Sequence, residues 1–157
     1  IAVQTAKSLV INMPRPRQSG YAVLPLSRPH DDAAVRSAEM AIEGNFSRTL
    51  RVEDLARERH MSARNFVRRF KAATGRTPGD YLQTTRMAVA KQLLESGARS
   101  VQTVCEAVGY EDAAFFRALF KRHTGMSPAE YRENFGATAA AERGHSRPGA
   151  PRPAARS

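Results

Sequence analysis

The chain has few of the features that staple a small fold or anchor it in a membrane. Its 157 residues include one cysteine, Cys105, so no disulfide can form within it. Cys105 lies in an apolar stretch, where we expect a small buried residue rather than a reactive thiol. No apolar run approaches roughly 18 residues, and no secretory signal sequence is present. Nothing therefore indicates export or a membrane partner, and the expected location is cytoplasmic.

Residues that carry enzymatic or metal chemistry are also sparse. The four histidines, His30, His60, His123 and His145, are scattered, and no metal-ligand spacing joins them to Cys105. No Ser/His/Asp grouping, paired carboxylates on one face or glycine-rich phosphate loop is evident. We therefore expect no enzyme in this sequence, with no catalytic residue, metal or cofactor.

Acidic residues are outnumbered by basic ones. The chain has 15 Asp and Glu against 25 Lys and Arg, which gives a formal net charge of +10. Such a balance favours a partner with phosphates or another anionic surface. Part of the excess lies near the C-terminus, at Arg143, Arg147, Arg152 and Arg156. Composition alone therefore leaves a soluble protein with basic tails as an alternative.

The most informative feature present is an internal repeat with an offset of 50 residues. The identical pairs are Phe66/Phe116, Phe70/Phe120, Lys71/Lys121, Thr74/Thr124, Gly75/Gly125, Pro78/Pro128 and Tyr81/Tyr131. Thr77/Ser127 and Asp80/Glu130 are chemically equivalent. Two copies indicate a duplicated module rather than a solenoid.

No segment alternates as a strand does, so the predicted fold class is all-α. Helices are predicted over residues 31–44, 52–59, 62–73, 78–96, 101–108 and 112–123, followed by a short one from Ser127 to near Gly136. Ser62 and Asp112 are the expected N-caps of the third and sixth helices, and Gly75 is expected to end the third. Thr77-Pro78-Gly79-Asp80 is a helix-start signal.

These helices predict two helix-turn-helix subdomains joined by a long linker helix. The tandem domain spans 31–136, with a first unit at 31–76, a linker helix at 77–97 and a second unit at 98–136. Residues 1–30 are expected to be a largely disordered remnant of an upstream domain and linker, and 137–157 a disordered basic tail. The linker helix is about 28 Å long at about 1.5 Å per residue. Successive major-groove faces are roughly 34 Å apart, so one chain could present two helices to successive grooves.

A short helix, a turn and a longer helix form a plan whose second helix lies in the DNA major groove. Residues four apart share a helix face, so Phe66 and Phe70 should pack into the core, with Leu55 from the preceding helix. Arg64 and Arg68 lie nearly opposite. Arginine matches the two acceptors on the guanine edge, which predicts base reading by this pair with Val67 beside it.

Other polar residues of these helices are better placed for phosphates. Arg69 and Lys71 flank the Arg64/Arg68 face, and Asn65 near the helix start could contact either a phosphate or a base. The full set of predicted phosphate contacts is Ser62, Asn65, Arg69, Lys71 and Lys121.

The second copy keeps the packing pair, Phe116 and Phe120, but changes the reading face. Ala114 and Ala118 stand where the first copy has arginines, and Arg117 stands where it has Val67. An alanine can contact a thymine methyl, and Arg117 is the strong polar reader. We therefore expect the first copy to supply most base discrimination.

The region 31–136, about two thirds of the chain, resembles the DNA-binding domain of the AraC/XylS transcriptional regulators. The carrying residues are Val52-Glu53-Asp54-Leu55-Ala56, Met61-Ser62-Ala63-Arg64, Phe70-Lys71, Gly75, Pro78 and Tyr81, then Val108-Gly109-Tyr110, Phe116, Phe120-Lys121, Thr124-Gly125, Ser127-Pro128 and Tyr131-Arg132. The resemblance implies two helix-turn-helix units joined by a long helix. It also implies sequence-specific binding to double-stranded promoter DNA, usually to activate transcription through RNA polymerase.

The resemblance also carries over the family's base-reading positions. They fall on Arg64, Val67, Arg68, Ala113, Ala114, Arg117 and Ala118. The chain departs from the family pattern at Ala118, where arginine is common, and at Arg51, where a capping Ser or Thr is usual. The first departure weakens the expectation that the second helix reads sequence, and the second predicts a softer helix start.

Residues 1–21 resemble the end of the DJ-1/PfpI-like (class I glutamine amidotransferase-like) domain that precedes this module in one subgroup. Thr5-Ala6-Lys7 and Gln18-Ser19-Gly20-Tyr21 carry this resemblance, and the sequence begins at Ile1 rather than Met. It implies that the chain is a piece of a longer protein, whose missing N-terminal domain would bind any effector and could make a dimer.

Two other classes of function stay open. A helical protein-interaction module with only nonspecific nucleic-acid affinity would leave a broad apolar stripe exposed. RNA binding is a weaker alternative, because aromatic stacking faces are scarce.

Overall fold

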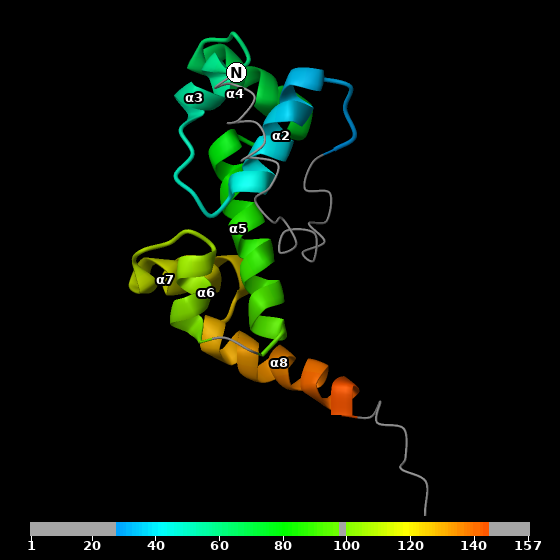
Figure 1. Ribbon diagram of the computed structural model, residues 1–157, viewed down its shortest axis with the longest axis vertical. Helices are drawn as coiled ribbons and strands as arrows, with labels where there is room; N and C mark the ends of the chain where they lie inside the picture. The colour runs from blue at the N-terminus through cyan, green and yellow to red at the C-terminus, as the bar shows by residue number, and fades with distance from the viewer. Residues whose placement is uncertain (1–27, 98–99, 145–157) are drawn as a thin grey trace, which may run out of the picture. The chain divides into compact units, whose positions relative to one another are not determined.

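The computed structural model describes residues 28–97 and 100–144, and in these ranges every regular element is a helix. Figure 1 shows them: α2 (Ala33–Asn45), α3 (Val52–Arg57), α4 (Ala63–Thr74), α5 (Pro78–Glu95), α6 (Val101–Ala107), α7 (Ala113–Thr124) and α8 (Pro128–Gly144). The predicted all-α class is confirmed. Among the described helices, none is both long enough and apolar enough to cross a bilayer.

The chain divides into two compact units, with the boundary inside α5 between Val89 and Ala90. Unit 1 holds the described chain up to Val89 together with Ala107–Gly109. Unit 2 holds Ala90–Glu106 and the described chain from Tyr110 onward. The predicted linker helix is therefore part of both cores rather than a bare spacer.

The core of unit 1 forms where α2, α3, α4 and the start of α5 meet. One face of α2 is buried through Val35, Ala38 and Ile42, which is the amphipathic pattern of a surface helix. Phe66 and Phe70 of α4 lie with ring centroids 5.7 Å apart, and Phe70 meets the Tyr81 ring edge-on at 5.6 Å. Leu55, Phe66 and Phe70 are buried, as predicted.

Unit 2 repeats this aromatic core. Phe116 and Phe120 are fully buried, and Phe120 meets Tyr131 edge-on at 5.4 Å. Cys105 is also buried, with its Sγ 3.2 Å from the carbonyl oxygen of Tyr110. The prediction of a small buried residue is confirmed. Burial also raises the pKa of the Cys105 thiol, which disfavours the reactive thiolate.

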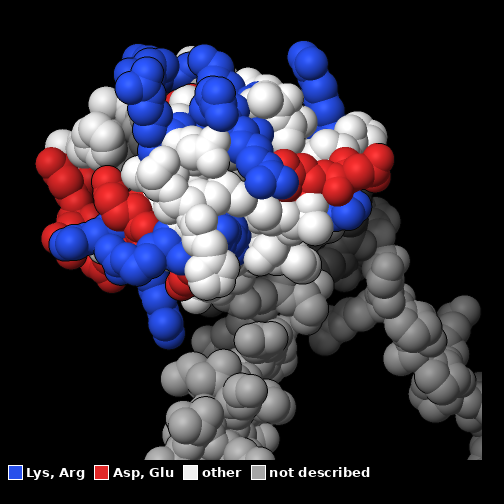
Figure 2. All heavy atoms as spheres, turned by 90° about the horizontal axis from the view of Figure 1, so that it is seen from above, with Lys and Arg blue, Asp and Glu red and all other residues white. Residues whose placement is uncertain are grey.

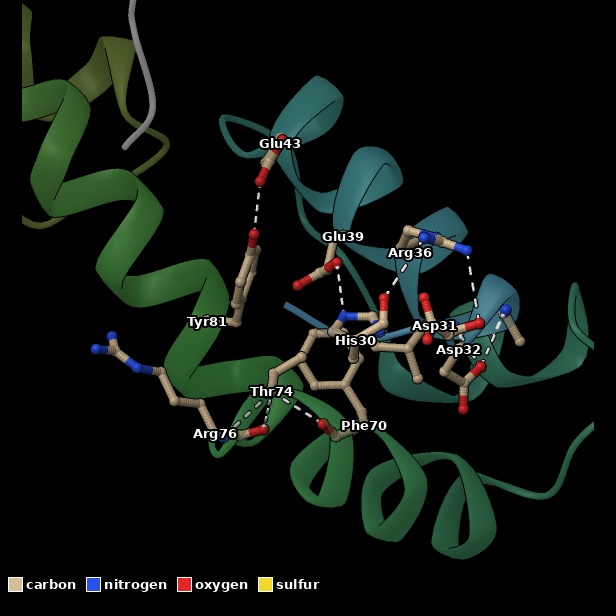
Figure 3. A network of polar contacts seen from close by, with 12 residues as sticks. His30, Asp31, Asp32, Arg36, Glu39, Glu43, Phe70, Thr74, Arg76 and Tyr81 are labelled. Carbon is tan, nitrogen blue, oxygen red and sulfur yellow. Dashed lines mark hydrogen bonds and ion pairs between the residues drawn. The ribbon is translucent and has the colours of Figure 1, made fainter. Parts of the chain in front are cut away.

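Each repeat closes with a tyrosine that hydrogen-bonds a glutamate of the helix preceding its helix-turn-helix. Tyr81 donates to Glu43 of α2 at 2.5 Å, and Tyr131 donates to Glu95 of α5 at 2.7 Å. The two ends of α5 therefore play complementary parts: Tyr81 near its start donates the bond of the first repeat, and Glu95 at its end accepts the bond of the second. Figure 3 shows the bond between Tyr81 and Glu43.

The predicted caps are present. Ser62 accepts a hydrogen bond from the Asn65 amide at 3.3 Å, and Asp112 accepts from the amides of Ala114 and Phe115. Gly75 and Gly125 end α4 and α7 with φ of 80° and 82°, which glycine adopts without steric cost. Arg51 makes no side-chain cap at the start of α3, as its departure from the family pattern predicts.

The same holds for the helix-start signals of α5 and α8. The Thr77 hydroxyl donates to Asp80 at 2.7 Å and accepts from the Asp80 amide. Ser127 and Glu130 also pair, but there the Ser127 amide, not its hydroxyl, donates to Glu130 at 2.7 Å, while the Glu130 amide donates to the Ser127 hydroxyl at 3.3 Å. In both repeats the N-cap hydroxyl therefore accepts from the third-residue amide, and the reciprocal capping box is complete at Ser127–Glu130.

The prediction for the last helix is wrong in its length. α8 continues to Gly144, so residues 137–144 are helical rather than part of the disordered tail expected for 137–157. Gly136 is buried, and a side chain there would meet the Leu94 carbonyl at 3.2 Å, so this glycine serves close packing rather than termination. The alanine-rich segment after it favours helix strongly. Residues 1–27 and 145–157 lie outside the described residues.

The turn before each recognition helix shows a second difference. Met61 donates to the Ala56 carbonyl as Tyr110 does to that of Cys105, so the turns correspond with an offset of 49 rather than 50. The left-handed residue of the turn is Gly109 in the second repeat, with φ of 87°, and His60 in the first, with φ of 56°. The first repeat thus places a side chain where the second has none.

Candidate nucleic-acid interface

The outward face of α4 carries two arginines in register. Arg64 and Arg68 are exposed, one turn apart, while Phe66 and Phe70 fix the opposite face in the core. Val67 between them is partly buried. Figure 2 shows basic side chains gathered on one face of unit 1, with acidic side chains to either side. The core pair therefore determines which way the arginines point.

Asn65 orients one of these arginines. Its Oδ1 accepts a hydrogen bond from the Arg68 guanidinium at 2.9 Å. Ser62, Arg64, Asn65 and Arg68 together line a shallow hollow at the start of α4. Four of the predicted contact residues thus lie around one concave surface, where a helix N-terminus also favours anions.

The remaining predicted phosphate contacts differ in their surroundings. Lys71 on α4 and Lys121 on α7 are exposed. Arg69 lies instead against α2, where its Nε donates to Asp32 at 2.5 Å. This ion pair holds the pKa of Asp32 below its ordinary value, with further help from the α2 amides. Arg69 is therefore engaged within the protein.

The corresponding face of α7 is largely apolar. Ala114, Arg117 and Ala118 are exposed and Ala113 is partly buried. Phe115 is 54% exposed and lies 5.9 Å from the Tyr110 ring, which in turn contacts buried Phe116. The sequence prediction included the alanines and Arg117 but missed this exposed aromatic, whose place one residue before Phe116 could have marked it.

Carboxylates limit where a polyanion could approach α7. Glu111 and Asp112 are exposed at its start, and one Asp112 oxygen is already bound to two helix amides. Among the described residues, no group of three or more His, Cys, Asp or Glu side chains is arranged to hold a metal ion. The candidate surface of α4 and α7 thus carries arginines, one amide side chain and apolar groups.

A buried polar network supports α4 from behind. His30 lies 3.2 Å from Glu39 of α2, and the Thr74 hydroxyl at the end of α4 bonds the carbonyls of Phe70 and Arg76 (Figure 3). Together with Tyr81 and Glu43, these contacts join α2, α4 and α5. They hold the end of α4, where Gly75 terminates the helix as predicted, against α2 and α5.

Comparison with known proteins agrees with this geometry. A family model described as a helix-turn-helix domain matches residues 55–134. The MmsAB operon regulatory protein of Pseudomonas aeruginosa is 37% identical over 117 residues, which cover 70% of this chain and 36% of that protein. An AraC-type DNA-binding domain structure from Chromobacterium violaceum superposes with a TM-score of 0.60 at 27% identity, covering 68% of this chain and 92% of that one. The chain belongs to the AraC/XylS family of transcriptional regulators.

Another solved relative adds information about the ligand class. The DNA-binding domain of AdpA, a global transcriptional factor, was solved in complex with a target DNA. It is 35% identical, with a TM-score of 0.61, and the match covers 69% of this chain and 96% of that one. This AraC/XylS chain covers about a third of the length of the MmsAB regulator.

Proposed function

We propose that this chain is the DNA-binding module of a transcription regulator and reads duplex DNA chiefly through α4. The observation that carries the proposal is the exposed Arg64/Arg68 pair, aimed outward by buried Phe66 and Phe70 and steadied by Asn65. Each arginine can bind guanine O6 and N7 in the major groove. A good bidentate pair contributes roughly 1–3 kcal/mol of discrimination.

Phosphate contacts would hold α4 in register without reading sequence. Ser62 and Asn65 lie at the helix start, and Lys71 is exposed two turns further along. Lys121 has the matching place on α7. Lysines at these positions favour binding to any duplex and make it sensitive to salt.

The second repeat contributes differently. Ala113 and Ala114 offer methyl groups to thymine, and Arg117 is the polar reader of α7. We propose that both helices enter successive major grooves, with α7 supplying register and one strong contact. This division of labour would be overturned if Arg64→Ala and Arg68→Ala each left binding untouched while Arg117→Ala abolished it.

For the whole regulator, the proposal extends to promoter binding in the cytoplasm and activation through RNA polymerase, with no enzymatic role for this module. Any effector would bind an N-terminal domain outside this sequence, and that domain would make the full-length dimer. The family membership, with relatives named as transcriptional activators, supports the regulatory role, while the polymerase, effector and dimer are parts of the proposal.

The alternative is a helical interaction module with only nonspecific affinity. It requires a continuous exposed apolar surface. Among the described residues, the large exposed hydrophobic side chains are Met40, Phe115 and Phe135, which stand on three different helices. They form no stripe along one helix, so the DNA-reading function is favoured.

The test is a binding competition at two salt concentrations. Promoter fragments from the source genome would be bound in the presence of excess random duplex, with the wild type beside Arg64→Ala/Arg68→Ala. The proposal predicts a complex that resists the competitor and is lost in the double variant. Binding that any duplex displaces equally, and that salt abolishes, would leave only the electrostatic contribution.

A further inference from the structure

The ion pair between Asp32 and Arg69 connects the start of α2 to the flank of the recognition helix. Asp32 uses both carboxylate oxygens: Oδ1 accepts from the amides of Ala34 and Val35 at 3.1 Å, and Oδ2 accepts from Arg69. The Asp32 side chain is only 18% exposed, while that of Arg69 is 48% exposed. Asp32 thus caps α2 and at the same time holds the guanidinium of Arg69 on α4.

We propose that Arg69 is a positioning residue. Its ion pair with Asp32 keeps the Arg69 side chain from DNA phosphates, and the pair fixes the orientation of α4. The proposal rests on the DNA-binding function inferred above. Arg69 directly follows Arg68, so its anchor fixes the helix rotation that presents Arg64 and Arg68.

The two partners differ in their exposure to water, because Asp32 is the more buried of the pair. For Arg69 to reach a phosphate it must leave a carboxylate that is mostly removed from water and has no second cation bonded to it among the described contacts. If Arg69 moved away, Asp32 would keep its two amide donors but lose the one cation bonded to it among the described contacts, which costs up to about fivefold in the equilibrium, or about 1 kcal/mol, for a partly exposed pair. Exposed Lys71 has no carboxylate partner among the described contacts and faces no such cost, so a phosphate is favoured at Lys71 over Arg69.

The residues just before Asp32 are also bonded to α2. Arg36 of α2 donates to the carbonyls of His30 and Asp31, and His30 pairs with buried Glu39 (Figure 3). The segment directly before Asp32 is thus attached to α2 by several bonds. The position of α4 therefore depends on the entry segment as well as on the hydrophobic core.

The test measures how the logarithm of the binding constant falls with the logarithm of salt concentration, on a selected duplex and on a random one. Each phosphate contact contributes about 0.9 to the slope, which is roughly a 3.5-fold loss for a fourfold rise in salt. Lys71→Gln, the positive control, should flatten the slope by about 0.9. Arg69→Gln should leave the slope unchanged and weaken binding to the selected duplex by roughly fivefold, a part of what one base contact contributes.

Asp32→Asn is the complementary variant, because asparagine still caps a helix while it releases Arg69. It should steepen the slope by up to about 0.9. Asp31→Asn is the matched control: it removes the same charge from the neighbouring exposed residue, and it should not steepen the slope. The double variant Asp32→Asn/Arg69→Gln should return to the Arg69→Gln slope.

Helicity and thermal unfolding would be recorded for every variant. If Arg69→Gln loses its fold, the double variant removes both charges and takes its place: a slope equal to that of the Asp31→Asn control supports the proposal. The proposal would be overturned if Arg69→Gln flattened the salt slope as much as Lys71→Gln does. It would also be overturned if the double variant had a flatter slope than the Asp31→Asn control. Failure of the DNA-reading function itself would look different, because the wild type would then bind both duplexes equally.

Discussion

At the scale of single residues, two tyrosines close the two repeats through bonds to glutamates. Tyr131 is the more accessible of the pair. Burial first, then the hydrogen bond to Glu95, raises the pKa of Tyr131 to about 12. The same causes, with Glu43 as partner, raise the pKa of Tyr81 further. Both phenols therefore favour the folded state only while they stay protonated.

The sign of the pH dependence follows from this. Between about pH 10 and 12 the unfolded chain loses the Tyr131 proton while the folded chain keeps it, so the free energy of unfolding falls as pH rises. Tyr131→Phe should cost about 1 kcal/mol at pH 8, because the bond to Glu95 is lost. The gap between wild type and variant, measured by urea unfolding, should shrink as the pH approaches 12. A constant gap would contradict the assignment.

His60 gives a second prediction for a single residue. Its φ of 56° is a conformation that Gly109 adopts freely at the matching position of the other repeat. A side chain there costs roughly 1–2 kcal/mol, and the added freedom of an unfolded glycine returns part of that difference. His60→Gly should therefore raise the free energy of unfolding by up to about 1 kcal/mol. Chemical denaturation would check it, with His60→Ala as a control that should bring no such gain.

At the scale of elements, the recognition helices begin with different caps. Ser62 makes one bond to an α4 amide, while Asp112 makes two to α7 and brings a negative charge near the proposed DNA surface. Capping and DNA binding therefore oppose each other at Asp112.

Two substitutions separate these effects. Asp112→Ala should lower the free energy of unfolding by about 1 kcal/mol, since two amides lose their acceptor. Asp112→Asn should retain most of that stability because asparagine also caps. Both should bind random duplex more tightly than wild type at low salt, because a carboxylate near phosphates is removed. Equal stability of the two variants would contradict the capping role.

The sequence predicted elements well wherever the signal is local. Ser62, Asp112, Gly75 and the Thr77–Asp80 box act within one turn of helix, so composition and spacing were enough to place them. The Arg64/Arg68 face followed from the period that buries Phe66 and Phe70. The pair between Asp32 and Arg69 was missed because 37 residues separate its members. Gly136 was misjudged because its close contact with Leu94 depends on tertiary packing.

At the scale of the whole molecule, the net charge of +10 favours binding to any duplex, and lysines of both repeats are placed to contact phosphates. Lys71 and Lys121 occupy the same position of the two recognition helices. If both repeats bind one DNA molecule, Lys71→Gln and Lys121→Gln should each flatten the salt slope by about 0.9, and the double variant by about 1.8. A slope that Lys121→Gln leaves unchanged would mean that only the first repeat engages.

The most direct test of the central claim is the motif that the protein enriches from a pool of randomised duplexes. The wild type should enrich a motif with guanines in the segment that α4 contacts, because arginines prefer the guanine edge. Arg64→Ala/Arg68→Ala should lose the preference at those positions while keeping that of the second repeat. An unchanged motif in the double variant, or no motif from the wild type, would contradict base reading by α4.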